Sequence, residues 1–264
     1  MPLYSATSPL PINMERRRTF NPSRISGLQL WLDATKGLFD ATSGGNQVTA
    51  DNSSVARWED QSGSGRHITQ ATSGDRPILK TSIQNSKNIL RFDGSSQYLS
   101  RTDAFVFNAG ATTIFCAIKS SAFVDRRLIS EGSSTSNTPV YAPMQSSQLD
   151  GTRVSHFCRT DGNVTILSNQ ENGGTAFNGS FNLVQISDTG SQFKFFVNKT
   201  ETGSVNYTRA TTTLNRFSIG CLLRASPGAF IACDLGEVII YNSVLSTSNK
   251  QLVENYLYSK WGIT

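Results

Sequence analysis

Acidic side chains are the first candidates for chemistry in this chain, because two carboxylates on one strand face can hydrolyse a glycosidic bond. Alternate residues of a strand share a face, so such a site needs a pattern such as Glu-x-Asp. No Glu in this sequence is followed two residues later by Asp. Glu59 and Asp60 are adjacent and therefore point to opposite faces, and Glu237 stands alone among apolar neighbours. We expect a protein that is not an enzyme.

The two histidines, His67 and His156, give no clear nucleophilic site either. His156 and Cys158 share a strand face, but their Cα atoms would lie about 6–7 Å apart, too far for an obvious dyad. The sequence favours a partly buried, hydrogen-bonded histidine. No glycine-rich phosphate loop precedes a helix, because the one helix predicted with any strength lies at the C-terminus.

The four cysteines, at positions 116, 158, 221 and 233, show no Cys-x-x-Cys spacing, so neither a zinc site nor a redox motif is indicated. Free cysteine behaves as a small hydrophobe, and buried free thiols are the favoured interpretation. A disulfide between Cys221 and Cys233 is the alternative if their strands pair in an oxidising compartment.

Single aspartates beside turns are candidates for Ca²⁺, which needs six or more oxygen ligands at one site. The pool is Asp33, Asp60, Asp150 and Asp161. Asp33, Asp60 and Asp93 each lie near a Ser or Gly turn, which favours loop capping, in which the carboxylate accepts from backbone N–H groups. We expect no cofactor, with Ca²⁺ as the weaker possibility.

Sugar-binding sites combine an aromatic face with amide groups, and five residues of these types are candidates. They are Tyr98, Tyr141, Asn163, Asn172 and Tyr207. Trp31 and Trp58 are also large enough to stack on a sugar, but their place at the ends of hydrophobic strands favours core packing.

The elements that must position these residues are short strands. From Leu28 onward, apolar segments recur every eight to twelve residues between Gly, Ser, Asn and Asp clusters, which is typical of a sandwich or jelly roll. The expected strands are 28–33, 55–59, 88–93, 97–101, 112–119, 127–130, 153–159, 181–187, 192–198, 203–208, 216–222 and 231–241. Alternation within 192–198 places Phe193 and Phe195 on one face and predicts an exposed Phe196 on the other. The loops 41–54, 131–139 and 168–179 are the expected recognition loops.

The C-terminal residues 231–264 predict a strand, a turn and a short helix. Ser246 is a candidate N-cap, Gly262 is a natural stop, and Leu252, Val253, Tyr256 and Leu257 form one apolar stripe. Trp261 is expected just past the helix, where it would fix the helix to the body.

Three motifs carry a family resemblance: Leu-Gln-Leu-Trp-Leu-Asp-Ala at 28–34, Trp-Glu-Asp-Gln-Ser-Gly at 58–63 with Arg-Phe-Asp-Gly at 91–94, and the ending Glu-Val-Ile-Ile-Tyr-Asn through Lys-Trp-Gly-Ile. Together they resemble the laminin-G-like, concanavalin-A-like jelly-roll domains found in bacterial surface proteins and phage virion proteins. The resemblance covers about residues 26–263. It implies an all-β, concanavalin-A-like jelly-roll sandwich with a short C-terminal helix. It implies little about function, because that architecture serves lectins, glucanases and packing modules alike.

Residues 1–25 are predicted to be an extended arm attached to a domain at 26–264, since Pro2, Pro9, Pro11 and Pro22 oppose a regular helix. The arm also carries apolar residues, so it would lie along its own domain or dock on a neighbour. Four arginines against one glutamate give residues 1–24 a net charge of +3, leaving +2 of the chain's +5 for the rest. A body so weakly charged is not expected to bind nucleic acid. The predicted attachment contacts are Arg16, Arg17, Arg18 and Phe20.

The expected function is a virion structural or adhesion protein, a capsid decoration or a tail or fibre component, held by its arm to other virion proteins or to its own copies. A carbohydrate-binding lectin that recognises a host or another glycan is the alternative. Residues 1–24 lack the apolar segment of a secretory signal, and no apolar run approaches a membrane span. We therefore expect assembly in a host cytoplasm and location in a virion, with an extracellular or cell-surface location as the alternative.

Overall fold

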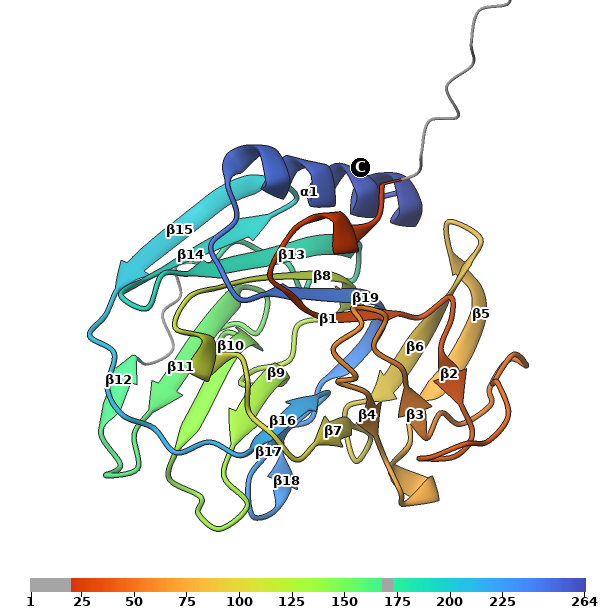
Figure 1. Cartoon of the computed structure of the whole chain (residues 1–264), viewed down its shortest axis with the longest axis horizontal. Helices are drawn as coiled ribbons and strands as arrows, with labels where there is room; N and C mark the ends of the chain where they lie inside the picture. Colours follow the sequence, from red (N-terminus) through yellow and green to blue (C-terminus); the bar gives the residue numbers. More distant parts are fainter. Residues whose placement is uncertain (1–19, 168–172) are drawn as a thin grey trace, which may run out of the picture.

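Two β-sheets face each other in the structure, a computed structural model that describes residues 20–167 and 173–264, and one helix covers the outer face of one sheet (Figure 1). The eight-stranded sheet runs in the order β15-β14-β13-β8-β19-β6-β5, with β1 also paired to β19. Its strands are β1 (Leu28–Asp33), β5 (Ile78–Gln84), β6 (Lys87–Asp93), β8 (Thr112–Ser120), β13 (Phe181–Asp188), β14 (Gln192–Val197), β15 (Thr200–Asn206) and β19 (Ala232–Tyr241).

The nine-stranded sheet runs in the order β12-β11-β10-β9-β16-β7-β4-β3-β2. Its strands are β2 (Leu38–Phe39), β3 (Arg57–Trp58), β4 (Ile68–Thr69), β7 (Leu99–Arg101), β9 (Arg127–Gly132), β10 (Val140–Ser146), β11 (Val154–Arg159), β12 (Thr165–Leu167) and β16 (Arg216–Ile219). A small hairpin of β17 (Leu222–Leu223) and β18 (Pro227–Gly228) follows β16. Leu222 of this hairpin packs on Val140 and Ala142 of β10, in a small apolar cluster apart from the main core. The hairpin therefore covers part of this sheet's outer face.

The predicted all-β sandwich with a C-terminal helix is confirmed, while the jelly-roll and laminin-G assignment stays a prediction from the resemblance. Trp31 and Trp58 are buried, which confirms core packing. Phe193 and Phe195 point into the core as expected, but the prediction of an exposed Phe196 is wrong, because Lys250 of the helix lies 4.0 Å from its ring centroid and covers it.

Strand β10 was not expected from the sequence, because Pro143 interrupts its pattern. The pairing of β10 shifts register between Ala142 and Gln145, so the proline falls at an irregular point of the ladder. A proline cannot donate to the ladder, and such irregular points are where sheets tolerate it.

Helix α1 (Thr247–Trp261) begins and ends as the sequence predicts. The Ser246 hydroxyl accepts from the Asn249 N–H at 3.3 Å, and Gly262 adopts the left-handed conformation at φ 60°. Trp261 is a correction, because it forms the last helical residue instead of following the helix. Its ring is fully buried and stacks on Phe181 of β13, with 5.8 Å between ring centroids. The helix is thereby fixed to the eight-stranded sheet.

A β-bulge at Gly236 shapes β19. The register with β8 shifts between Leu235 and Glu237, so Asp234 and Glu237 both reach the outer face although they are three residues apart. A Cβ atom on Gly236 would lie 2.9 Å from the Trp261 ring, so only glycine lets the indole approach this closely. On either side of the bulge, β6 pairs with Ala232–Leu235 and β1 pairs with Glu237–Tyr241.

Part of the predicted arm contacts the body. Residues 1–19, with Arg16, Arg17 and Arg18, lie outside the described residues. The Phe20 ring lies 5.7 Å from that of Tyr256 in the helix, and the Tyr241 hydroxyl donates to the Pro22 carbonyl at 3.0 Å. Pro22 is the first residue of a 3₁₀ turn, η1 (Pro22–Arg24), which precedes β1 in the sequence. Within the described part of the chain, no helix is both long and apolar enough to cross a membrane.

Candidate functional site

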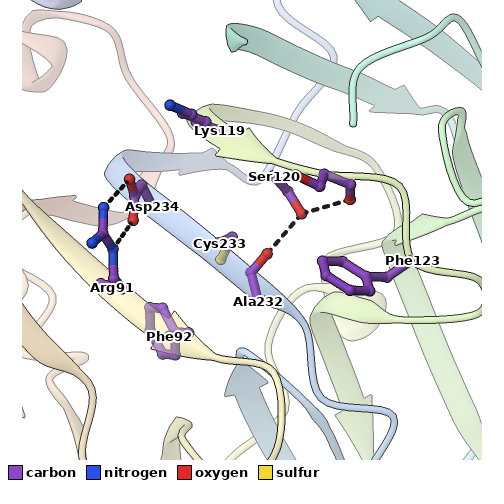
Figure 2. A pocket seen from close by; sticks show the side chains of 9 residues that line it. Arg91, Phe92, Lys119, Ser120, Phe123, Ala232, Cys233 and Asp234 are labelled. Carbon is purple, nitrogen blue, oxygen red and sulfur yellow. Dashed lines mark hydrogen bonds and ion pairs between the residues drawn. The ribbon is translucent and has the colours of Figure 1, made fainter. Parts of the chain in front are cut away.

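A pocket of about 240 Å³ opens where β8 ends and β19 begins (Figure 2). Strand β6 and the loop after β8 complete it. The residues that line it are Arg91, Phe92, Lys119, Ser120, Ser121, Phe123, Ala232, Cys233 and Asp234. The Ser120 hydroxyl donates to the Ala232 carbonyl at 2.7 Å, which joins the two strand ends at the floor of the pocket.

Three charged side chains form a row across the outer face of the eight-stranded sheet. Asp234 of β19 is directly opposite Arg91 of β6 on one side and Lys119 of β8 on the other. The Arg91 guanidinium donates to both Asp234 oxygens, Nε to Oδ1 at 2.6 Å and an Nη atom to Oδ2 at 2.7 Å. This bonding raises the pKa of Arg91. Such a two-point pair fixes the plane of both groups.

The row is asymmetric. The Asp234 carboxylate is buried, whereas the Arg91 side chain is 42% exposed. The exposed Lys119 ammonium has no hydrogen-bond or ion-pair partner within residues 20–167 and 173–264. A ligand in the pocket would therefore contact two cations, Arg91 and Lys119. It would also contact the Asp234 carboxylate, whose two oxygens already accept from Arg91.

An exposed aromatic ring forms the other side of the pocket. Figure 2 shows Phe123 in the loop after β8, facing the start of β19, with Asp234 farther along that strand and Arg91 beyond it on β6. Phe123 is 42% exposed. Its backbone is held in place, because the Ser146 hydroxyl donates to its carbonyl and Gly151 packs so closely that a Cβ there would lie 2.6 Å from the Phe123 carbonyl carbon.

This combination suits a sugar ring. The C–H face of a pyranose is apolar and packs on an aromatic ring, while its hydroxyls both donate and accept. Phe123 supplies the aromatic face, and Arg91, Lys119 and Asp234 supply donors and acceptors. Asp234 is the one carboxylate among the nine lining residues.

Two of the predicted glycan-binding tyrosines lie inside the sandwich. Tyr141 and Tyr207 both donate to the Asp188 carboxylate, at 3.0 Å and 2.9 Å. Burial raises the pKa of all three groups. Because Tyr141 is fully buried and Tyr207 nearly so, we leave both out of the proposed site.

The other three candidates do not come together. Tyr98 precedes β7 and packs on Phe230, with 6.2 Å between ring centroids. Asn163 occupies an exposed turn between β11 and β12, and β10, β9 and β16 separate these strands from β7 in the order of the sheet. Asn172 lies outside the described residues. Their role in glycan binding stays a prediction.

The candidate calcium ligands act as caps for separate loops. Asp33 accepts from the Thr35 N–H at 3.0 Å, Asp150 from the Thr152 N–H at 2.9 Å and Asp161 from the Thr213 N–H at 3.0 Å; Asp60 accepts from the Ser62 N–H at 2.8 Å. Asp93 caps the turn at Ser95 in the same way. The loop-capping interpretation is confirmed. Among residues 20–167 and 173–264, no three His, Cys, Asp or Glu side chains gather as metal ligands would.

Glu237 stands alone among apolar neighbours in the sequence, and the fold surrounds its carboxylate with polar side chains from other elements. Glu237 is fully buried under α1, where Trp31 and Tyr256 donate to Oε1 at 2.6 Å and 2.7 Å. Trp261 donates to Oε2 at 2.8 Å, and the Lys260 ammonium lies 2.7 Å from the same oxygen. Burial raises the pKa of Glu237, and Lys260 opposes that shift. The carboxylate thus joins β1, β19 and the helix.

A second buried glutamate, Glu131, forms no ion pair with the residues that the structure describes. Glu131 of β9 accepts from the consecutive N–H groups of Phe105, Val106 and Phe107, at 2.6, 2.7 and 2.8 Å. These residues lead into the 3₁₀ turn η3 (Phe107–Ala109). Burial raises the pKa of Glu131 to about 7, although the three N–H donors favour its charged form.

The core around β11 differs from prediction in one respect. His156 is fully buried, not partly, and stacks on Phe193 with 3.7 Å between ring centroids. Burial lowers the pKa of His156 to about 3, and a backbone hydrogen bond with Ala142 opposes that shift. The prediction of a partly buried histidine is therefore wrong. The four cysteines are buried and free, which confirms the favoured interpretation.

Sequence reasoning missed all four key pocket residues, Arg91, Lys119, Phe123 and Asp234. Arg91 and Asp234 are 143 residues apart, so their pairing depends on strand register that no local pattern reveals. Phe123 offered the one available signal, an aromatic residue in a small, polar loop that begins with two serines.

No protein-family model matches this sequence, and no curated protein matches it. Among solved structures, the chain is similar to the Trypanosoma rangeli sialidase in complex with sialic acid, with a TM-score of 0.53 and 13% identity over 89% of this chain and 33% of that one. It also aligns with the Ruminococcus gnavus IT-sialidase CBM40 bound to alpha2,3 sialyllactose, with a TM-score of 0.44 and 17% identity over 54% of this chain and 80% of that one. The chain spans about a third of the length of the sialidase, and the likeness is one of fold.

Proposed function

We propose that this protein is a carbohydrate-binding module without catalytic activity, and that the pocket between β6, β8 and β19 holds one sugar ring. The observation that carries the proposal is the placement of the exposed Phe123 ring across from the Arg91–Asp234 pair. The ring would stack on Phe123, and its hydroxyls would bond to Arg91 and Lys119. Since the T. rangeli sialidase was solved with sialic acid, sialylated oligosaccharides belong among the first ligands to test.

The experiment is a glycan array that contains neutral and sialylated oligosaccharides, followed by titration of the best ligand. Phe123→Ala should weaken binding by about tenfold, because it removes the stacking surface while the polar groups stay. Val124→Ala is the matched control, since Val124 is the adjacent exposed apolar residue and does not line the pocket.

Three outcomes count against the proposal. An array with no saturable ligand contradicts a carbohydrate-binding role. A ligand whose affinity is equal in the wild type and in Phe123→Ala places the binding site elsewhere. Release of free sugar from the bound oligosaccharide contradicts the non-catalytic part.

Attachment through the N-terminal arm is a second, compatible role, in which the pocket would be displayed by a virion or other assembly. One observation favours a defined exit point for the arm: Phe20 and Pro22 are held by Tyr256 and Tyr241. Arg16, Arg17, Arg18 and Phe20 remain the proposed contacts.

These contacts change where a truncation should end. Removing residues 1–19 leaves Phe20 and Pro22 in place, so the domain should fold with an unchanged melting temperature and lose its association with particles or with its own copies. Sedimentation of the full and shortened chains measures this. Equal association of the two chains would rule out attachment through the arm.

A further inference from the structure

Four arginines converge on the outer face of the nine-stranded sheet, opposite the face that packs in the core. Arg127 lies on β9, Arg159 on β11, Arg216 on β16 and Arg224 in the loop of the β17–β18 hairpin. Phe157 lies among them, with its ring centroid 5.9 Å from the Arg127 guanidinium carbon and 5.8 Å from that of Arg159. Four positively charged side chains therefore lie close together on this sheet.

Two of these guanidinium groups share a single acceptor. Arg159 and Arg224 both donate to the Asn137 carbonyl, at 2.7 Å and 2.6 Å, so their donor nitrogens lie close together. Arg159 also donates through Nε to the Thr138 carbonyl at 2.5 Å, and Arg216 donates to the Arg224 carbonyl at 2.7 Å. The arginines are thus held in place by backbone oxygens, which carry no full charge.

The charge of this cluster is not balanced by the described residues. Arg127 pairs with Asp125, but no carboxylate of residues 20–167 and 173–264 forms an ion pair with Arg159, Arg216 or Arg224. Burial lowers the pKa of Arg224, and the nearby Arg159 and Arg127 lower it further. The buried Nε atoms of Arg127 and Arg224 have no acceptor in the described part of the chain. Like charges held together at a partly buried surface are unfavourable unless an anion joins them.

We propose that Arg159 and Arg224 together bind one oxyanion group, the sulfate or carboxylate of an acidic polysaccharide. Their contacts with the Thr138 and Asn137 carbonyls use Arg159 Nε and Nη2 and Arg224 Nη1, which leaves Arg159 Nη1 and Arg224 Nη2 without a hydrogen bond to the described residues. One donor nitrogen from each guanidinium group can therefore bond to two oxygens of the same anion, and both side chains are half-buried, so solvent reaches them. Arg127 and Arg216 supply further positive potential. A point cluster on a body of low net charge fits a single charged substituent better than the continuous phosphate backbone of a nucleic acid. The site goes beyond the proposed function, since it lies on the other sheet and shares no residue with the pocket.

The test compares binding of the full chain to dextran sulfate and to neutral dextran at the same ionic strength. The wild type should bind dextran sulfate saturably and neutral dextran much more weakly. Arg159→Lys and Arg224→Lys should each weaken binding by about tenfold, because lysine keeps the charge and loses the two-point geometry. Arg153→Lys is the matched control. Arg153 lies just before the first residue of β11, whereas Arg159 is its last residue. The Arg153 side chain is 45% exposed and pairs with Asp150.

Equal affinity of Arg159→Lys, Arg224→Lys and the wild type for dextran sulfate would overturn the proposal, as would an equal loss in Arg153→Lys. If the variants fail to fold, the wild type is titrated with sodium sulfate against sodium chloride at matched ionic strength, and arginine Nε–H signals are followed by NMR. Saturable shifts with sulfate alone support the site, and identical shifts with both salts refute it. Phe123→Ala should bind dextran sulfate like the wild type, which separates this site from the sugar pocket.

Discussion

Asp234 and Glu237 lie three residues apart on β19, on the same face of the same sheet, and have different surroundings. Helix α1 covers Glu237, which is surrounded by two indoles, a phenol and an ammonium group. The helix does not cover Asp234, whose partner Arg91 is partly exposed beside Lys119, and Lys119 has no partner among the described residues. The Glu237 carboxylate therefore holds the helix to the sheet, whereas the Asp234 carboxylate lines an open pocket.

The difference shows what the helix contributes. Every polar atom of the Glu237 carboxylate is satisfied inside the protein, so it offers nothing to a ligand. Beyond the helix, the charged row keeps free bonding capacity at Arg91 and Lys119. Removing the covered carboxylate should therefore change stability, whereas altering the open row should change binding.

The largest effect is expected from Glu237→Ala. It leaves two indole N–H groups and the Tyr256 hydroxyl without their acceptor in a buried place, and Lys260 keeps Asp33 as its ion-pair partner. The free energy of unfolding should therefore fall by roughly 3 kcal/mol. Urea denaturation measures the change. Glu201→Gln, which breaks an exposed pair with Lys194, is the control and should cost about 1 kcal/mol or less. A loss for Glu237→Ala as small as the control's would contradict the structural role of the network.

The next effect concerns pH and Glu131. Its folded-state pKa of about 7 exceeds its ordinary value of 4.5, so the folded protein binds the proton more tightly between these pH values. The free energy of unfolding should consequently fall as pH rises from about 4.5 to 7, by up to about 1.4 kcal/mol per pH unit. The raised pKa values of Glu237 and Asp188 act in the same direction.

Glu131→Gln removes this titration and should flatten the profile of stability against pH, measured by urea denaturation at several pH values. An unchanged slope in the variant would assign the pH dependence to the other buried acids. The variant should also be less stable throughout, because an amide cannot accept from three N–H groups as a carboxylate does.

A smaller change in stability is expected from Asp234→Asn. The Arg91 pair is partly solvated, so its loss should lower the free energy of unfolding by about 1 kcal/mol or less. Sugar binding should fall more clearly, because Arg91 loses the two-point contact that orients it. Calorimetric melting and ligand titration on one sample compare the two effects. A large loss of stability with unchanged binding would reverse the contrast between Asp234 and Glu237.

The smallest effect on stability is expected from Lys119→Ala. Lys119 is exposed and has no partner in the described part of the chain, so the melting temperature should stay within about 1–2 °C of the wild-type value. Its contribution should appear only in the affinity for the sugar. A marked drop in the melting temperature would show that the ammonium has a structural contact.

Local patterns predicted most of the framework and little of the site. The Ser246 cap, the Gly262 stop and the alternation around Phe193 depend on neighbouring residues, and the structure agrees with each. The Arg91–Asp234 pair depends on which strands meet and in which register, and the burial of Phe196 depends on where the helix lies. A single sequence does not determine these long-range choices, so local reasoning found abundant Tyr and Asn residues instead of the pocket.

The position of β19 has a consequence for how the protein is made. This strand lies inside the eight-stranded sheet and pairs with β8, β6 and β1, yet it follows all of them in the sequence. Until β19 has been synthesised, the edges of β8, β6 and β1 lack their partner and are open to wrong pairing with other chains. Nascent chains that stop before residue 232 should therefore aggregate or need a chaperone, and native folding of the sandwich should wait until β19 has left the ribosome.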